Sequence, residues 1–111
     1  MNKEIVDYMK ENLGLDDMDL IQELYDEYVN TIKERLPSAN NALEAKDFQT
    51  LAKIAHAMKG CALNIGHESF AVTAKELEYL GKGLGPEPPT TENCSALLSK
   101  LNTIFEDFLK A

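Results

Sequence analysis

The sequence has little that would indicate an extracellular, membrane-spanning or metal-clustering protein. Its two cysteines, Cys61 and Cys94, are far apart and form no CxxC pair. We therefore expect free thiols in a cytoplasmic chain, with no metal site. No apolar run approaches the roughly 20 residues that cross a bilayer. The opening residues, MNKEIVDYMKENLG, contain several acidic side chains and no apolar central stretch, so they do not predict a signal peptide.

Basic residues are also scarce. The chain has 11 lysines and arginines against 19 aspartates and glutamates, which gives a net charge of −8. A nucleic-acid-binding protein needs a positive surface, and an anionic membrane repels a negative one. We therefore expect neither nucleic acid nor a membrane among its partners.

The alternation of apolar and polar residues that is typical of β-strands is missing, and no internal repeat is present. Apolar residues instead recur at gaps of three and four, which predicts amphipathic helices. We predict an all-α chain with a first helix at about residues 3–12 and a long second helix that begins after Asp17. Pro37 is expected to interrupt this second helix, leaving a brief helical turn at residues 39–45. Further helices are predicted at about residues 48–64, 68–80 and 92–110.

The lengths of these helices and of their connections predict the architecture. Four helices are long and mostly joined by short connections, which favours an antiparallel up-down-up-down four-helix bundle with a short additional N-terminal helix. At 111 residues the chain fits a single domain, with the bundle core at about residues 15–110. Gly66 is expected to end the third long helix in a left-handed conformation. The stretch GKGLGPEPPTT, from Gly81 to Thr91, is the one linker that its glycine and proline content predicts.

The segment FQTLAKIAHAMKGCALNIG, which begins with the predicted helix at 48–64, contains the candidate reactive residues. His56 lies about 100° around the helix from the inward-facing Ala55, at the edge of the buried face or beyond it. Lys59 and Gly60, three and four residues later, stand beside it. A glycine within an exposed helix costs about 1 kcal/mol of stability relative to alanine. The presence of Gly60 despite this cost would be explained if another protein approaches the imidazole closely, because glycine has no side chain in the way. Such a histidine can accept a phosphoryl group, although a half-buried histidine beside a solvated lysine is the commoner meaning of this spacing.

A longer motif extends this spacing: Ala55-His56-Ala57-Met58-Lys59-Gly60, then Asn64-Ile65-Gly66 and, on the next predicted helix, Leu77-Glu78. On these residues the chain resembles a known family, the histidine-containing phosphotransfer (HPt) domains. The resemblance covers about residues 15–83. Two positions depart from the family pattern: Met58 stands where leucine is commoner, and Cys61 stands where serine or another small residue is frequent.

This resemblance implies a phosphorelay intermediate. A receiver-domain aspartyl phosphate would phosphorylate His56, which would pass the group to another receiver aspartate. Lys59 would stabilise the phosphoryl group, Gly60 would leave room for the partner, and Glu78 would accept a hydrogen bond from the imidazole and orient it. The family often has glutamine at the position of Glu78. The chain has no nucleotide-binding loop, so we expect no enzyme with its own ATP site and no cofactor, with Mg²⁺ bound by the partner receiver domain.

The expected partners are response-regulator receiver domains and a hybrid sensor histidine kinase, and we expect a monomer. Docking is expected around His56 through Ala52, Lys53, Leu63 and Arg35. One alternative is a phosphotransfer domain excised from a hybrid or chemotaxis-type histidine kinase, although a start at Met1 and a completed last helix weakly favour a stand-alone protein. A second alternative is a receiver-binding bundle without phosphotransfer. A third is an enzyme with a phosphohistidine in its own cycle, which would place His56 in a cleft.

Overall fold

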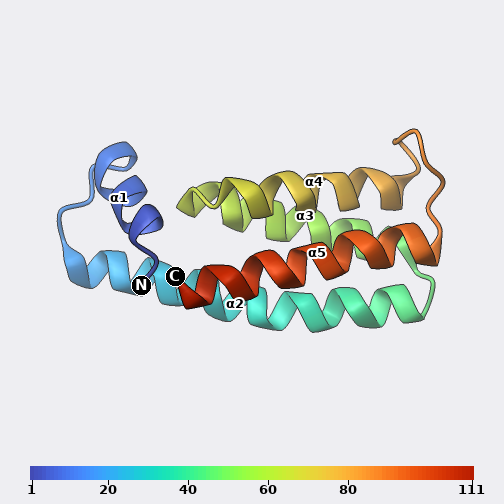
Figure 1. Ribbon diagram of the computed structural model, residues 1–111, viewed down its shortest axis with the longest axis horizontal. Coiled ribbons are helices and arrows are strands. Elements are labelled where there is room, and N and C mark those ends of the chain that lie inside the picture. The colour runs from blue at the N-terminus through green and yellow to red at the C-terminus, as the bar shows by residue number, and fades with distance from the viewer.

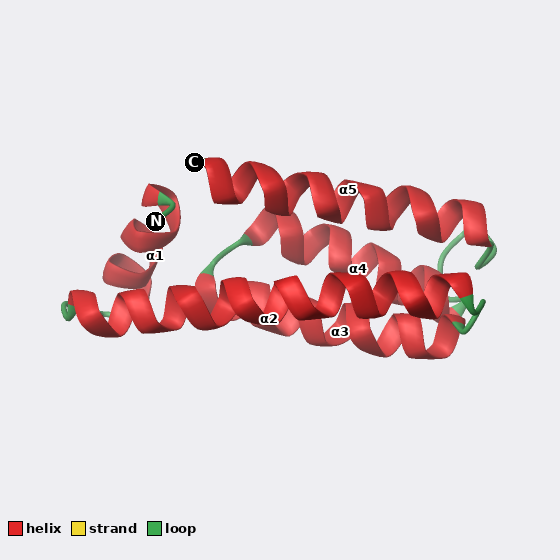
Figure 2. Ribbon diagram, turned by 90° about the horizontal axis from the view of Figure 1, so that it is seen from below, coloured by secondary structure: helices red, strands yellow, loops and turns green.

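The computed structural model describes residues 1–111 as five helices without a strand, so the predicted all-α class is confirmed. Four long helices lie side by side, and a short N-terminal helix packs at one end of them, where both termini lie (Figures 1 and 2). No helix is long and apolar enough to cross a membrane. The helices are α1 (Lys3–Asn12), α2 (Met18–Glu44), α3 (Phe48–Ile65), α4 (Glu68–Lys82) and α5 (Thr91–Lys110).

Local signals in the sequence set most of the helix ends. The side chains of Asp17, Asp47 and Thr90 each accept a hydrogen bond from a backbone N–H in the first turn of α2, α3 and α5. Gly66 ends α3 with a φ of +84°, as its sequence position predicts. Gly66 also lies directly against the Tyr8 ring, which a Cβ at this position would overlap. The glycine therefore both ends α3 and lets α1 pack against it.

The prediction that Pro37 interrupts the second helix is wrong. α2 continues through Pro37 to Glu44. A proline in a helix interior removes one backbone hydrogen bond and costs about 3 kcal/mol. The three apolar residues after it, Ala39, Ala42 and Leu43, are all buried in the core. Because burying one leucine side chain contributes about 1.5–3 kcal/mol, tertiary packing offsets the cost of the proline.

α4 extends two residues further than predicted, to Lys82, and the linker begins at Gly83. Gly81 lies within the helix because α4 approaches α3 closely there. A Cβ on Gly81 would lie 2.9 Å from the Phe48 carbonyl oxygen and 3.1 Å from the Ala52 Cβ. Gly81 is therefore a close-packing residue, which its glycine-rich sequence context does not reveal.

The core at the α1 end contains a cluster of aromatic rings around a buried histidine. The His67 ring is stacked on Phe108, with 4.5 Å between the ring centroids. It is also stacked on Phe70, with 5.6 Å between the ring centroids. Its Nδ1 lies 2.7 Å from the Tyr28 hydroxyl oxygen. Burial lowers the pKa of His67 to about 4 and raises the pKa of Tyr28. Both side chains are therefore uncharged at neutral pH and belong to the core.

Candidate functional site

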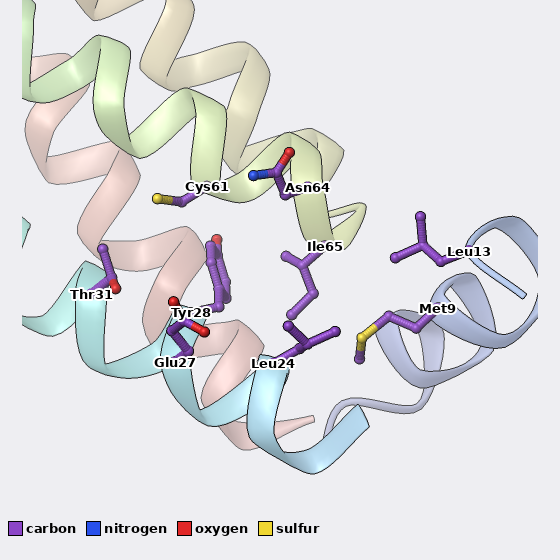
Figure 3. Close-up of a pocket in the computed structure, with 9 residues that line it drawn as sticks. All are labelled: Met9, Leu13, Leu24, Glu27, Tyr28, Thr31, Cys61, Asn64 and Ile65. Carbon is purple, nitrogen blue, oxygen red and sulfur yellow. The ribbon is translucent and has the colours of Figure 1, made fainter. Parts of the chain in front are cut away.

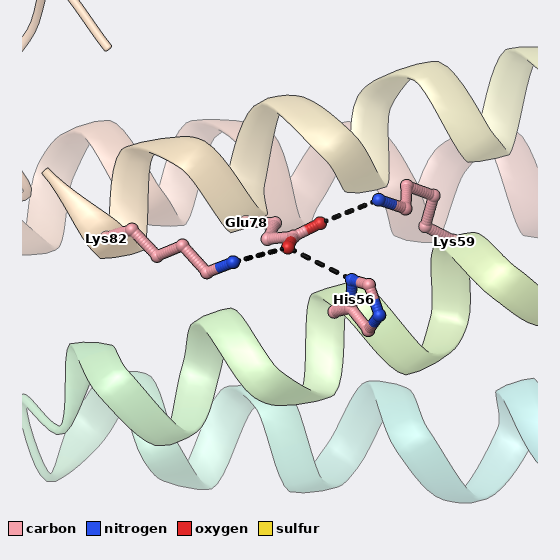
Figure 4. Close-up of polar contacts among 4 residues, drawn as sticks. All are labelled: His56, Lys59, Glu78 and Lys82. Atoms are coloured by element: carbon pink, nitrogen blue, oxygen red, sulfur yellow. Dashed lines mark hydrogen bonds and ion pairs between the residues drawn. The ribbon is translucent and has the colours of Figure 1, made fainter. Parts of the chain in front are cut away.

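α3 holds His56 at the surface because its other face is fixed in the core by Leu51, Ala55 and Met58. The His56 side chain is 65% exposed. Its Nδ1 lies 3.0 Å from the Oε2 atom of Glu78 on α4, and the other ring nitrogen points away from Glu78 (Figure 4). The ring is thus fixed on one side and open on the other.

Glu78 is the centre of this cluster. Its side chain is only 3% exposed, yet it contacts three donors. Lys59 donates to Oε1 at 3.0 Å, and Lys82 donates to Oε2 at 2.7 Å, beside His56 (Figure 4). Burial alone would raise the pKa of Glu78. The hydrogen bonds from Lys82 and Lys59, the positive charge of Lys59 and the hydrogen bond with His56 act in the opposite direction. Together they outweigh burial and lower the pKa of Glu78 to about 2. Glu78 is therefore a buried carboxylate that stays ionised.

This ionised carboxylate determines what the imidazole can do. A carboxylate only accepts hydrogen bonds, so in the neutral form of His56 the proton must be on Nδ1. The lone pair is then on Nε2, the nitrogen that points away from Glu78. The two ammonium groups of Lys59 and Lys82 exceed the single negative charge of Glu78, so the cluster favours an incoming anion. Chemically, this is an accessible nitrogen nucleophile in a locally positive environment.

Lys82 is the member of the cluster that the sequence interpretation missed. It follows Glu78 by four residues on α4, a spacing at which oppositely charged side chains pair on a helix, so the signal was present. The predicted linker begins at Gly81, so the sequence pattern places Lys82 outside the helix, whereas α4 includes it. The ammonium of Lys59, expected beside His56 to stabilise a phosphoryl group, is bound to Glu78, and the Lys59 side chain is 20% exposed.

The residues predicted to form the docking surface are only partly available to a partner. Ala52 is 2% exposed and packs beneath Gly81, so its placement on the docking surface is wrong. Lys53, Leu63 and Arg35 are exposed. At Gly60, an added Cβ would meet nothing within 4 Å, so the helix surface next to His56 is open.

A separate cavity lies between α1, α2 and α3. Cys61 lines this cavity (Figure 3), whereas His56 does not. The cavity has a volume of about 150 Å³ and is mostly apolar. The structure brings together no group of three or more His, Cys, Asp or Glu side chains that could hold a metal ion. The cavity is lined by Met9, Leu13, Leu24, Glu27, Tyr28, Thr31, Cys61, Asn64 and Ile65.

Comparison with protein families matches residues 23–107 to the family described as Hpt domain. The matched range extends from the first turns of α2 almost to the end of α5 and contains the whole cluster around Glu78. No curated protein and no solved structure has a significant match to the chain.

Proposed function

The chain belongs to the Hpt domain family, whose members transfer phosphoryl groups through histidine in two-component phosphorelays, and on this premise we propose a specific relay step. His56 accepts a phosphoryl group from the aspartyl phosphate of one receiver domain and passes it to the aspartate of another. The observation that carries this proposal is the exposed imidazole whose Nδ1 is bound to an ionised, buried carboxylate.

The proposed chemistry follows from the tautomer. Nε2 of His56 attacks the phosphorus atom of the aspartyl phosphate, the bond between phosphorus and the aspartate oxygen breaks, and the aspartate leaves as a carboxylate. The ring keeps its proton on Nδ1 and becomes positively charged, and Glu78 stabilises that charge through the 3.0 Å contact. The ammonium groups of Lys59 and Lys82 favour the phosphoryl group electrostatically. Transfer to the second receiver reverses these steps.

The chain acts in this proposal as a reactant rather than as an enzyme with its own ATP site. A hybrid sensor histidine kinase with its receiver domain supplies the phosphoryl group, and a response-regulator receiver domain takes it. Mg²⁺ is expected on the receiver, where it neutralises charge during phosphoryl transfer. The exposure of His56 on the surface of α3 supports a protein partner over a small substrate.

The proposal includes the arrangement of the helices. We propose that residues 1–111 are one domain in which α2 to α5 form an antiparallel up-down-up-down bundle. The contacts of α2 with α3, of α3 with α4 and of α4 with α5 support this arrangement, because each helix packs against the next one in the chain. A contact between α2 and α5 closes the bundle.

Phosphoryl transfer from a labelled kinase and receiver tests the proposal. The intact protein and His56→Gln are incubated in parallel, after circular dichroism has shown the same helix content for both. We expect label on the intact protein that is labile in acid and stable in base, and none on His56→Gln. Label that persists in His56→Gln would exclude His56 as the acceptor. An intact protein that binds receivers but takes no label from any of them would be a receiver-binding bundle without phosphotransfer.

A further inference from the structure

The face of the molecule that carries His56 differs in charge from the rest. Although the chain has 19 acidic residues, α3 contains none of them. His56, Lys59 and Leu63 follow each other on α3 at spacings of three and four residues, so they share one face. Val72 and Lys75, with Tyr79 one turn later, form a similar row on α4.

These two rows border an open hollow of about 500 Å³ between α3 and α4. Leu63 is 52% exposed, Val72 59% and Tyr79 42%, so three of the nine large apolar residues that the chain exposes are gathered here. Single exposed apolar residues are ordinary, but a cluster of them on rigid helices is typical of an interaction site. The hollow is lined by Lys59, Leu63, Glu68, Ala71, Val72, Lys75 and Tyr79.

The hollow is continuous with the site around His56 through one residue. Lys59 lines the hollow and its Nζ lies 3.0 Å from the Glu78 Oε1 atom. Tyr79, on the α4 side, directly follows Glu78 in the chain. A partner that fills the hollow therefore also lies beside the imidazole.

Charge indicates which kind of partner fits. The charged lining of the hollow has two lysines, Lys59 and Lys75, and one carboxylate, Glu68. The outward side of α2 is mostly acidic, although Lys33 and Arg35 are exposed there too. A shallow hollow along this helix is lined by Asp19, Glu23, Asp26, Glu27 and Glu34 among its charged residues. An acidic partner is therefore repelled by α2 and attracted to the α3–α4 face.

We propose that the α3–α4 hollow is the docking site of the receiver domain, which seats an apolar side chain between Leu63, Val72 and Tyr79. The receiver's own phosphoryl site, with its aspartate and its Mg²⁺-binding carboxylates, then faces His56 and the lysines beside it. This inference rests on the proposed function and deepens it, because it assigns docking to α4 in addition to α3. The earlier expectation of contacts through Arg35 would place the partner over α2 instead.

Two glutamate substitutions in the hollow test the inference, with two matched controls elsewhere. Val72→Glu and Leu63→Glu add a negative charge to the hollow without touching the core. Leu84→Glu, at a position 70% exposed in the linker, and Leu109→Glu, at a position 42% exposed on α5, make the same kind of change away from it. Single-turnover phosphoryl transfer is measured against receiver concentration, together with receiver binding by calorimetry.

We expect Val72→Glu and Leu63→Glu to raise the half-saturating receiver concentration roughly tenfold, the size of a lost interface hot spot, with little change in the rate at saturation. The two controls should transfer like the intact protein. If a glutamate variant loses helix content, Tyr79→Ser and Leu63→Ser provide milder substitutions with the same expected direction. Normal transfer by the intact protein and unchanged half-saturation in all hollow variants would overturn the docking site while leaving the relay function in place. Failure of the intact protein to accept any phosphoryl group would overturn the relay function itself, and the inference with it.

Discussion

Lys82 and His56 donate to the same oxygen atom: Lys82 Nζ lies 2.7 Å and His56 Nδ1 3.0 Å from Oε2 of Glu78. The other oxygen is taken by Lys59. Glu78 therefore divides its negative charge between two lysines and the imidazole, and the lysine on its own helix makes the shortest of the three contacts.

Removing this lysine should lower stability at neutral pH and weaken its dependence on pH in the acid range. A carboxyl group whose pKa is lowered by folding adds stability that is fully present above its ordinary pKa of 4.5 and is lost as the pH falls toward 2. For Glu78 this amounts to a contribution on the order of 3 kcal/mol. In Lys82→Met the pKa of Glu78 should rise toward 4.5, because burial is opposed by fewer donors. The variant should therefore be less stable than the intact protein at pH 7 and should lose less stability between pH 4.5 and 2. Chemical unfolding followed by circular dichroism from pH 7 to 2 measures this.

Lys75→Met is the matched control for that experiment. Lys75 lies on the same helix and its Nζ is 5.5 Å from the centroid of the Tyr79 ring, without a contact to Glu78. It should therefore leave the acid limb of the stability curve unchanged. Equal curves for Lys75→Met and Lys82→Met would show that Lys82 has no special role in keeping Glu78 ionised.

His67 should titrate far below an ordinary histidine. Burial lowers its pKa from 6.5 to about 4, so folding favours its neutral form. The stability that depends on this neutral form is present above pH 6.5 and decreases as the pH falls to about 4, because the unfolded chain binds the proton more readily. The imidazole resonances in a proton–carbon NMR titration should show a midpoint near pH 4 for His67. A midpoint near 6.5 would mean that the ring is not held in the aromatic cluster.

Two glycine substitutions on α3 should have opposite effects on stability. Gly60→Ala meets nothing within 4 Å and should raise the free energy of unfolding by up to about 1 kcal/mol, since alanine favours the helix. The same methyl group lies beside His56 and should slow transfer to a receiver. Gly66→Ala should destabilise the fold, because the position has a φ of +84° and its Cβ would overlap the Tyr8 ring. Denaturant unfolding and single-turnover transfer check both variants; a Gly60→Ala protein that transfers at the normal rate would contradict the role of Gly60 in access.

Pro37→Ala should stabilise the protein. The substitution restores a backbone N–H in the interior of α2, and the proline it replaces costs a helix about 3 kcal/mol. Part of the gain is offset because alanine leaves the unfolded chain more flexible, so we expect an increase of about 1–2 kcal/mol in the free energy of unfolding. Ser38→Ala, at the exposed neighbouring position, is the comparison, and a Pro37→Ala protein less stable than the original would show that the proline relieves strain in α2.

Much of the fold follows from local signals in the sequence. Spacing places the helices, Asp17 and Asp47 mark two helix starts, and Gly66 marks a helix end. The angular position of His56 relative to Ala55 predicts a ring at the edge of the buried face or beyond it, and the ring is 65% exposed. These features depend on residues that are near one another in the chain, which is why the pattern reveals them.

The features that the sequence did not reveal depend on how helices pack. Pro37 remains within α2 because the residues beyond it are buried, and Gly81 remains within α4 because α3 approaches it closely. The burial of Ala52 and the pairing of Lys82 with Glu78 both follow from that extended α4. Neither the approach of the two helices nor its closeness is encoded in local propensity.

The carboxylate of Glu78 also ties α4 to α3, because it binds Lys59 and His56 from one helix and Lys82 from its own. A phosphoryl group on Nε2 would be added at the open side of the ring and would leave the hydrogen bonds of Glu78 in place. The loaded and unloaded forms of the carrier would then have the same shape and differ in charge at one point on the surface. Receivers would have to distinguish the two forms by electrostatics rather than by conformation.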